Sequence, residues 1–594
     1  MGDRWTLLGT IGAGGRVRID RRGVVAPEGA TWSLDWWVGA EDRWHIASDG
    51  ALVRQSLVDA TPVVLSAMRL SGGEIEQRAW GAVDGGSGLA VLVVDLHNAT
   101  SVPVALALAF TSSAGDGTTI DASDGVVSID GAAVGRFSRL PSRFAVDGPG
   151  RSARDVTVTG EASATFPSGG VRTGAGSATV AFVFPLPHTA TLRVVLPLRV
   201  DVDVADLARL DPWSLPPFER VVAGWKAQVA RAPRFDLPER GLDAAVDAAR
   251  CHLLVHVATD DPLRFPGVVV DGHVRSELTM ALDEQGLSVE GERLLLAALE
   301  HQAADGSFDA DRLDATAGWL VAAERHVTIG GSAELARALS EPVVSAAHWL
   351  SRRQRNRLRR SHSFFATGAG PRGMSETERV ARDARLTRRS YLAAIRLLDI
   401  AGETDAALAV RLHLAALVEE MERRAIDDVD PETDIASLGR LRADLLAGEP
   451  LWAWSSGIDA HDPALTAAFL RNLRALVVDD GSDVVDLLPG FGEPWLGQPL
   501  AVHRLPTAAG TLSFALRWHG ARPALLWEVE GDRSFTLACS SIDPGWSSRE
   551  ARGETLLSAP VLDHVHLSGA FDSATSPNSG SAAESPVAGG GSFS

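Results

Sequence analysis

Residues 301–326, which read HQAADGSFDADRLDATAGWLVAAERH, carry four aspartates between two apolar segments of helical period. Carboxylates can accept hydrogen bonds from the hydroxyl groups of a ligand, and two of them together can act as general acid and base. The four are Asp305, Asp309, Asp311 and Asp314. The same residues also suit structural roles, because Asp305-Gly306 is a turn signal and Asp314 stands where a helix could be capped. The sequence leaves both a ligand-binding loop and a structural turn open.

A second acidic group stands at the start of a helix that we expect near residues 378–401. Glu376 and Glu378 follow the Gly- and Pro-rich run ATGAGPRGM, which indicates a loop. Arginines follow at Arg382, Arg385, Arg388 and Arg389. Guanidinium groups so close would keep the carboxylates ionised and lower the pKa that an acid catalyst needs raised. The alternative for Glu376 and Glu378 is a solvated loop of surface ion pairs.

Two more stretches combine residue types that could bind or react. LWAWSSGIDAHDPAL brings two aromatic rings together with carboxylates and an imidazole, and DDPLRFPGVVVDGHVRSE brings acidic and basic side chains into a loop. The first holds Trp452, Trp454, Asp459, His461 and Asp462, and the second holds Asp271, His273 and Arg275. Asp462 before Pro463 is equally a helix N-cap with Pro at the first helical position. A lone His and Arg in a loop are commonly just exposed.

The elements that must position these residues follow from two changes of hydrophobic period. From about residue 4 to residue 200, short Val-, Ala-, Leu- and Thr-rich runs alternate with Gly, Asp and Ser turns, which predicts an antiparallel β-sandwich. Helical periodicity then fills residues 239–480, and short strands return after residue 484. We count about ten helical segments, among them one near 274–285 and one near 378–401. The number approaches twelve if short helices lie in the gaps.

We therefore expect a multidomain α+β chain with a disordered tail. The expected parts are an N-terminal β-sandwich at 1–205, a linker and entry helix at 206–238, a helical domain at 239–483, a small C-terminal β-sandwich at 484–570 and the tail at 571–594. The tail is rich in Ser, Gly and Ala and has little to bury.

The stretch TWSLDWWVGAEDRWH concentrates four tryptophans in the N-terminal part: Trp32, Trp36, Trp37 and Trp44. On a strand, Trp32 and Trp36 would share one face and Trp37 would take the other. Part of this cluster could then form either a carbohydrate-contacting edge or the seam against the helical domain. Because domain interfaces need large apolar anchors, we favour the seam.

Composition excludes several classes of protein. The formal net charge of -20 argues against a nucleic-acid partner, because phosphate binding needs clustered cations. No apolar run reaches the roughly 18 residues of a membrane span, and the first residues contain no apolar run long enough to predict a signal peptide. Cys251 and Cys539 lie far apart and predict two buried free thiols, which favours a cytoplasmic location. No paired His or Cys spacing indicates a metal, no cofactor motif stands out, and the oligomeric state stays open.

In the order β-sandwich, helical hairpins, small β-sandwich, the chain resembles the six-hairpin glycosidase superfamily of alpha-L-rhamnosidase, glycogen-debranching and glucoamylase relatives. The resemblance covers about residues 4–570. In such proteins an outer helix often ends in Gln-x-x-Asp-Gly-x-Phe, and an Asp and an aromatic residue often open the next helix. The matching residues here are Gln302, Asp305, Gly306, Phe308, Asp314 and Trp319.

The resemblance implies an (α/α)6 toroid whose central funnel admits an oligosaccharide or glucan, with no cofactor. It also implies inverting hydrolysis, in which an acid and a base stand roughly 6.5 to 9.5 Å apart across the scissile bond. On this basis Glu376 is the expected acid and Asp459 the expected base. The expected substrate-binding residues are Asp271, Arg275, Asp314, Trp319, Trp452, Trp454 and His461.

The chain departs from the family pattern near the expected acid. Where relatives carry Trp, Tyr and Phe around an Asp, this sequence has Val380 and the arginines that follow it. Arginines would be poor stacking platforms for a neutral sugar. A second function therefore stands beside hydrolysis: a catalytically inactive family member that binds a carbohydrate or a protein partner.

Overall fold

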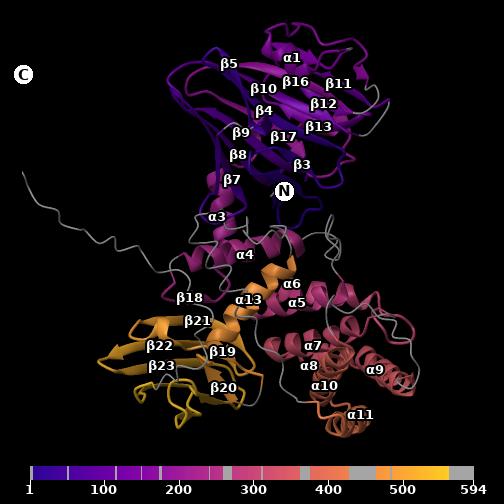
Figure 1. The fold of residues 1–594 in the computed structure, drawn as a ribbon, viewed down its shortest axis with the longest axis vertical. Helices are drawn as coiled ribbons and strands as arrows, with labels where there is room; N and C mark the ends of the chain where they lie inside the picture. Colours follow the sequence, from indigo (N-terminus) through magenta and orange to yellow (C-terminus); the bar gives the residue numbers. More distant parts are fainter. Residues whose placement is uncertain are drawn as a thin grey trace, which may run out of the picture.

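The computed structural model describes residues 5–49, 52–113, 117–148, 150–172, 177–239, 241–257, 271–309, 312–360, 375–426, 463–481 and 484–560. The side chains of residues 355–360, 376 and 377 lie outside that description. Figure 1 shows three parts: the N-terminal strands at the top, the helices below them, and the C-terminal strands beside the helices. Mixed helices and sheets make this a multidomain α+β chain, as the sequence predicts.

Two antiparallel sheets form the N-terminal part. The eight-stranded sheet contains β1 (Trp5–Leu8), β2 (Val17–Asp20), β3 (Val25–Pro27), β4 (Trp32–Ala40), β10 (Val104–Ser112), β16 (Ala178–Leu186) and β14 (Arg143–Val146) in that order, with β5 (Arg43–Ile46) paired to β4. The nine-stranded sheet has the order β15 (Val171–Arg172), β11 (Thr119–Ser123), β12 (Val126–Ile129), β13 (Ala132–Phe137), β17 (Thr191–Pro197), β9 (Ala90–Asn98), β8 (Gly73–Val83), β7 (Val63–Leu70) and β6 (Val53–Leu57). A short 3-10 helix, η1 (Ala47–Asp49), follows β5.

The tryptophans of β4 belong to the sandwich and not to a seam with the helices. Trp32 and Trp36 share the face that enters the sandwich core, where Trp36 is fully buried. Trp37 takes the other face and packs with small residues beneath α1 (Ala153–Val158), where Ala153 also lies. The predicted alternation is confirmed and the expected seam is wrong, because α1 covers the outer face of this sheet and offers the apolar surface locally.

The segment that follows the sandwich covers the outer face of the nine-stranded sheet. It contains α2 (Val204–Arg209), η2 (Pro212–Ser214) and α3 (Phe218–Val229), which pack on Trp80 and its neighbours. The next strand, β18 (Arg234–Asp236), pairs with β21 (Leu500–Thr507). The end of the expected linker is therefore an edge strand of the C-terminal sheet, and Phe235 is buried there.

The described helices of the middle part begin at Leu242. They are α4 (Leu242–Val257), α5 (Gly272–Glu284), α6 (Ser288–Leu299), α7 (Leu313–Gly330), α8 (Ala333–Ala338), α9 (Ser340–Arg360), α10 (Glu376–Ala401), α11 (Thr404–Arg423) and α13 (Pro463–Val477). Local chemistry sets their ends: α10 begins with a capping box between Ser375 and Glu378, and α7 ends at Gly331 with φ 73°.

The C-terminal part has a five-stranded sheet, β18-β21-β22-β23-β26, and a four-stranded sheet, β19-β20-β24-β25. Their bounds are β19 (Val478–Asp479), β20 (Val484–Leu487), β22 (Gly510–His519), β23 (Arg522–Glu530), β24 (Thr536–Ala538), β25 (Ser547–Ser548) and β26 (Arg552–Leu556), with η3 (Glu493–Trp495) between β20 and β21. One apolar core joins Leu254 of α4 and Leu470 of α13 to Leu516 of β22. The C-terminal strands thus share one core with the helices α4, α5 and α13.

Three further findings bear on function. No helix within the described ranges is long and apolar enough to cross a membrane. Over the same part of the chain, no group of three acidic, His or Cys side chains could hold a metal ion. Cys251 and Cys539 are free and buried, which confirms the two predicted thiols.

Candidate functional site

Four helices, α13, α5, α7 and α10, pack side by side in that order. At one end, Arg312 at the N-cap of α7 forms ion pairs with Asp271, the N-cap of α5, at 2.5 Å and with Asp314 at 2.9 Å. Arg382, in the second turn of α10, lies 3.9 Å from Asp314. We call Asp271, Arg312, Asp314 and Arg382 the rim. The rim joins the N-terminal ends of α5, α7 and α10.

At the other end, the same helices meet through a second set of ion pairs. Arg325 near the end of α7 lies 3.1 Å from Glu284, the last residue of α5, and Arg396 of α10 lies 3.3 Å from Glu324 of α7. The last turn of α13 reaches the same place, because Arg474 donates to the carbonyl of Pro506 and Gly286, just after α5, also lies against Pro506. N-terminal ends therefore lie with N-terminal ends, and the four helices run in one direction.

The residues that the sequence singles out fall at the N-terminal ends of this row. Asp271 caps α5, Asp314 is in the first turn of α7, and α10 begins at Glu376. Trp452, Trp454, Asp459 and His461 directly precede α13 in the sequence but lie outside the described residues, as does the side chain of Glu376. Asp271 and Asp314 come together, and Arg312 is the residue that joins them.

Asp314 is held ionised at the rim. Burial raises the pKa of its carboxyl, but the hydrogen bonds and charge of Arg312 outweigh burial and leave that pKa below its usual range. Arg312 forms two parallel bonds to Asp314, from Nε at 3.1 Å and from Nη2 at 2.9 Å. This geometry suits a carboxylate that accepts hydrogen bonds, and not one that donates a proton.

The acidic loop itself has a structural role at Asp305. Oδ1 of Asp305 accepts hydrogen bonds from the backbone N–H of Ser307 at 3.0 Å and from its hydroxyl at 2.6 Å. Gly306 takes φ 92°, which confirms the predicted turn. Asp311 lies outside the described residues.

Trp319 and Arg275 line a small cleft behind the rim, between α5, α6 and α7. Trp319 is 3% exposed and stacks on Phe308, with ring centroids 4.6 Å apart. The cleft has a free volume of about 20 Å³, which suits a water molecule rather than a sugar ring. Nε of Arg275 is buried there without a hydrogen-bond partner among the described residues. In these positions Trp319 has one face covered by Phe308, and Arg275 is one of the polar residues that line the cleft.

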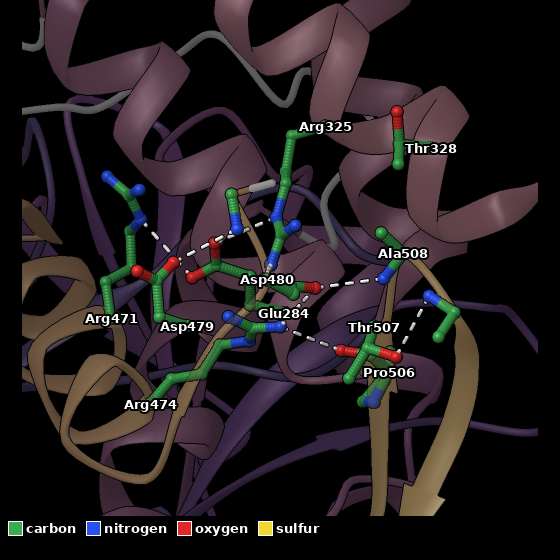
Figure 2. Close-up of polar contacts among 12 residues, drawn as sticks. Glu284, Arg325, Thr328, Arg471, Arg474, Asp479, Asp480, Pro506, Thr507 and Ala508 are labelled. Carbon is green, nitrogen blue, oxygen red and sulfur yellow. Dashed lines mark hydrogen bonds and ion pairs between the residues drawn. The ribbon is translucent and has the colours of Figure 1, made fainter. Parts of the chain in front are cut away.

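A cluster of ion pairs lies at the C-terminal ends of the row, and sequence reasoning missed it (Figure 2). Arg325 bridges Glu284 and Asp480, at 3.1 Å and 2.8 Å, and Arg474 lies 2.9 Å from Asp480. Arg471 approaches Glu284 from α13 at 3.3 Å. We call Glu284, Arg325, Arg471, Arg474 and Asp480 the buried network. Its only sequence signal is a charged residue within each of several otherwise apolar helical stretches.

The carboxylates of the buried network are fixed in the ionised state. Burial raises the pKa of Glu284, but three guanidinium groups offset burial and leave that pKa below its usual range. Burial likewise raises the pKa of Asp480, and Arg474 and Arg325 lower it well below its usual range. The buried network can therefore hold elements together but supplies no proton.

The few accessible positions on α5 and α7 mark the side of the row that water reaches. From Leu313 to Val327, every residue of α7 is buried except Asp314 and Arg325, and from Ser276 to Glu284 of α5 the exception is Glu277. A helix buried almost all round belongs to an inner layer. The three exceptions are charged and only partly exposed, and we call the side of the row that carries them its accessible side.

Neither a protein-family model nor a curated protein matches this chain. A candidate kojibiose phosphorylase from the human microbiome matches with TM-score 0.50 and 8% identity, over 92% of this chain and 90% of that one. A bacterial glucoamylase in complex with acarbose gives TM-score 0.47 and 10% identity, over 70% and 69%. A rhamnosidase of Bacillus sp. GL1 gives TM-score 0.39 and 12% identity, over 75% and 52%.

The match to the candidate kojibiose phosphorylase extends over nearly the whole of both chains. At 8% identity it shows a similarity of fold alone. It confirms the expected resemblance at that level. The chain resembles six-hairpin glycosidase-like proteins in its fold, with flanking β domains.

Proposed function

We propose that this chain is a glycoside hydrolase that binds a saccharide on the accessible side of the row α13-α5-α7-α10. The observation that carries the proposal is the common direction of these four helices. The stretches that precede α5, α7, α10 and α13 contain the carboxylates and tryptophans that the sequence predicts as site residues. A common direction brings the ends of such stretches to one side of the molecule.

The proposed chemistry is hydrolysis with inversion, in the funnel of a toroid that the row forms in part. Glu376 gives a proton to the leaving oxygen, and Asp459 activates a water, with the two carboxyl groups roughly 6.5 to 9.5 Å apart. Trp452 and Trp454 stack on sugar rings. Hydroxyl groups are held by Asp271, Asp314, Arg275 and His461, and Trp319 supports the wall behind them.

One feature favours the second candidate, a family member that binds a saccharide without cleaving it. The carboxylates of the rim and of the buried network are paired with arginines, and Glu376 is the first residue of α10. A helix N-terminus stabilises the ionised form of a carboxylate, whereas a general acid needs its proton at the working pH. Binding and turnover must therefore be measured separately.

The experiment combines calorimetric titration and turnover assays of the full chain with oligosaccharides and aryl glycosides. We expect Glu376→Gln to keep binding and to lower kcat by about 100-fold or more, as loss of a general acid does. Asp399→Asn is the matched control, because Asp399 lies at the far end of α10 in an exposed pair with Arg411. Binding without turnover in the wild type would establish the second candidate. Absence of any saccharide binding would overturn both.

A further inference from the structure

Glu277 and Arg471 form an ion pair between the rim and the buried network. Glu277 lies six residues beyond Asp271, which places it about 9 Å along α5 at roughly 1.5 Å per residue. Glu284 lies two helical turns further, in the buried network. The pair therefore stands at mid-depth on the accessible side of the row, and it joins α5 to α13.

The pair is held in place on one side and open on the other. Nη1 of Arg471 donates to Oε2 of Glu277, and its Nε donates to Oε2 of Glu284 at 3.3 Å. Within the described part of the chain, Nη2 of Arg471 and Oε1 of Glu277 have no hydrogen-bond partner. The side chains are 20% and 29% exposed, respectively. The free donor and the free acceptor thus belong to two partly exposed side chains that are paired with each other.

Because the residues around the pair are buried, the guanidinium of Arg471 is held in a fixed position. Glu277 is the one accessible residue of α5 between Ser276 and Glu284, and Arg471 is anchored by the fully enclosed carboxylate of Glu284. A guanidinium fixed at two of its nitrogens loses little further entropy when it binds a ligand. An ordinary surface pair has no such anchor and is worth little.

A fixed donor beside a fixed acceptor matches two neighbouring hydroxyl groups of a sugar, because each hydroxyl can both donate and accept. The charge balance points to an uncharged ligand. The three carboxylates Glu277, Glu284 and Asp480 balance the three arginines Arg325, Arg471 and Arg474. An anionic sugar would therefore gain little attraction here and would meet the carboxylate of Glu277.

We infer that Glu277 and Arg471 bind adjacent hydroxyl groups of a neutral sugar unit, the one that enters deepest. The inference rests on the proposed saccharide site and extends it from the rim to the middle of the row. In this role Glu277 accepts a hydrogen bond from one hydroxyl, and Arg471 donates to its neighbour.

The test is calorimetric titration of the full chain with kojibiose, maltotriose and L-rhamnose. For the probe that the wild type binds, we expect Glu277→Gln to weaken the affinity about 10-fold and Glu277→Ala about 100-fold. Asp399→Asn is the control for loss of an ion pair elsewhere and should leave the affinity unchanged. Circular dichroism and the melting temperature establish that each variant is folded.

A deoxy analogue of the same probe supplies a readout that a structural role would not move. If Glu277 binds a hydroxyl, removal of that hydroxyl weakens binding to the wild type and has no effect on binding to the folded Glu277→Ala variant. Equal affinity of wild type and Glu277→Gln for a bound probe would overturn the inference while the proposed saccharide site survives. Failure of the wild type to bind any of the probes would remove both.

Discussion

At the residue scale, the sequence identifies the candidate residues by their chemical type, but it does not predict their hydrogen-bond and ion-pair partners. Asp305-Gly306 reads as a turn, and the turn is there because both signals are local. Asp314 reads as a cap or a ligand-binding carboxylate, and it is paired with Arg312, two residues earlier. Its neighbours Asp271 and Arg382 come from helices far away in the sequence. The spacing of residues along the chain does not predict that side chains from distant helices form ion pairs with one another.

Gly306 gives a prediction at this scale. Its φ is +92°, and a Cβ at this position would lie 2.2 Å from the carbonyl oxygen of Ser345. We expect Gly306→Ala to lower the free energy of unfolding by about 2 kcal/mol or more, through left-handed strain and the clash. Urea denaturation measures the change.

Gly330 is the matched control for that substitution. It lies at the end of α7, where a Cβ would meet nothing within 4 Å. Gly330→Ala should be neutral or slightly stabilising, because Ala favours a helix. A Gly306→Ala variant as stable as Gly330→Ala would show that the turn tolerates a side chain.

At the element scale, periodicity and end signals place most helices well. The segment expected near 274–285 is α5, Gly272–Glu284, and the one expected near 378–401 is α10, Glu376–Ala401. The small offsets are at caps, where Asp271 and Ser375 begin the helices earlier than the apolar pattern does. The order and common direction of the row could not be predicted, since both depend on packing between distant segments.

The contact of α5, α6 and α7 contains a histidine between two carboxylates. Nδ1 of His326 lies 2.8 Å from Oδ1 of Asp283, which is fully buried, and its Nε2 lies 3.4 Å from Glu292 of α6. Burial lowers the pKa of His326, but Asp283 and then Glu292 offset burial and raise it above its usual value. Burial raises the pKa of Asp283 to about 6.

Both shifts are upward, which fixes the sign of the pH dependence. A group whose pKa is raised on folding stabilises the fold fully below its unfolded value and loses that contribution as the pH rises through its folded value. We expect the free energy of unfolding to fall by on the order of 1 kcal/mol between about pH 6 and pH 9, as His326 loses its proton beside Asp283.

Urea denaturation across that pH range measures the effect, with His326→Gln as the comparison. Gln keeps a donor near Asp283 but does not titrate, so its stability should change less with pH than that of the wild type. An equal slope in both proteins would place the pH dependence elsewhere.

At the scale of the whole molecule, the order of the parts follows from the sequence because each part has its own hydrophobic period. The contacts that join the parts do not follow from the sequence. Phe235, expected in a linker, lies in a strand of the C-terminal sheet. The tryptophan cluster of residues 32–44, expected in part at a domain seam, packs within the N-terminal sandwich. An apolar residue in the sequence predicts burial, but it does not predict which part of the chain will cover it.

The buried network is the main polar connection between the row and the segment that leads into the C-terminal strands. Arg325 on α7 holds Asp480, whose Oδ2 also accepts a hydrogen bond from the backbone of Ala508 at 2.9 Å. The exposed fractions of the side chains of Arg325 and Asp480 are 12% and 3%. Removing one partner of so enclosed a pair leaves a charge without compensation.

We therefore expect Arg325→Met to lower the free energy of unfolding by about 3–5 kcal/mol, because Glu284 and Asp480 stay buried and lose a shared partner. Arg411→Met is the control: Arg411 is 43% exposed in its pair with Asp399, and a surface pair contributes about 1 kcal/mol or less. Urea denaturation gives both values, and limited proteolysis of the native proteins should release the C-terminal strands faster in Arg325→Met. Similar losses in the two variants would mean that the apolar core shared by Leu254, Leu470 and Leu516 alone holds the two parts together.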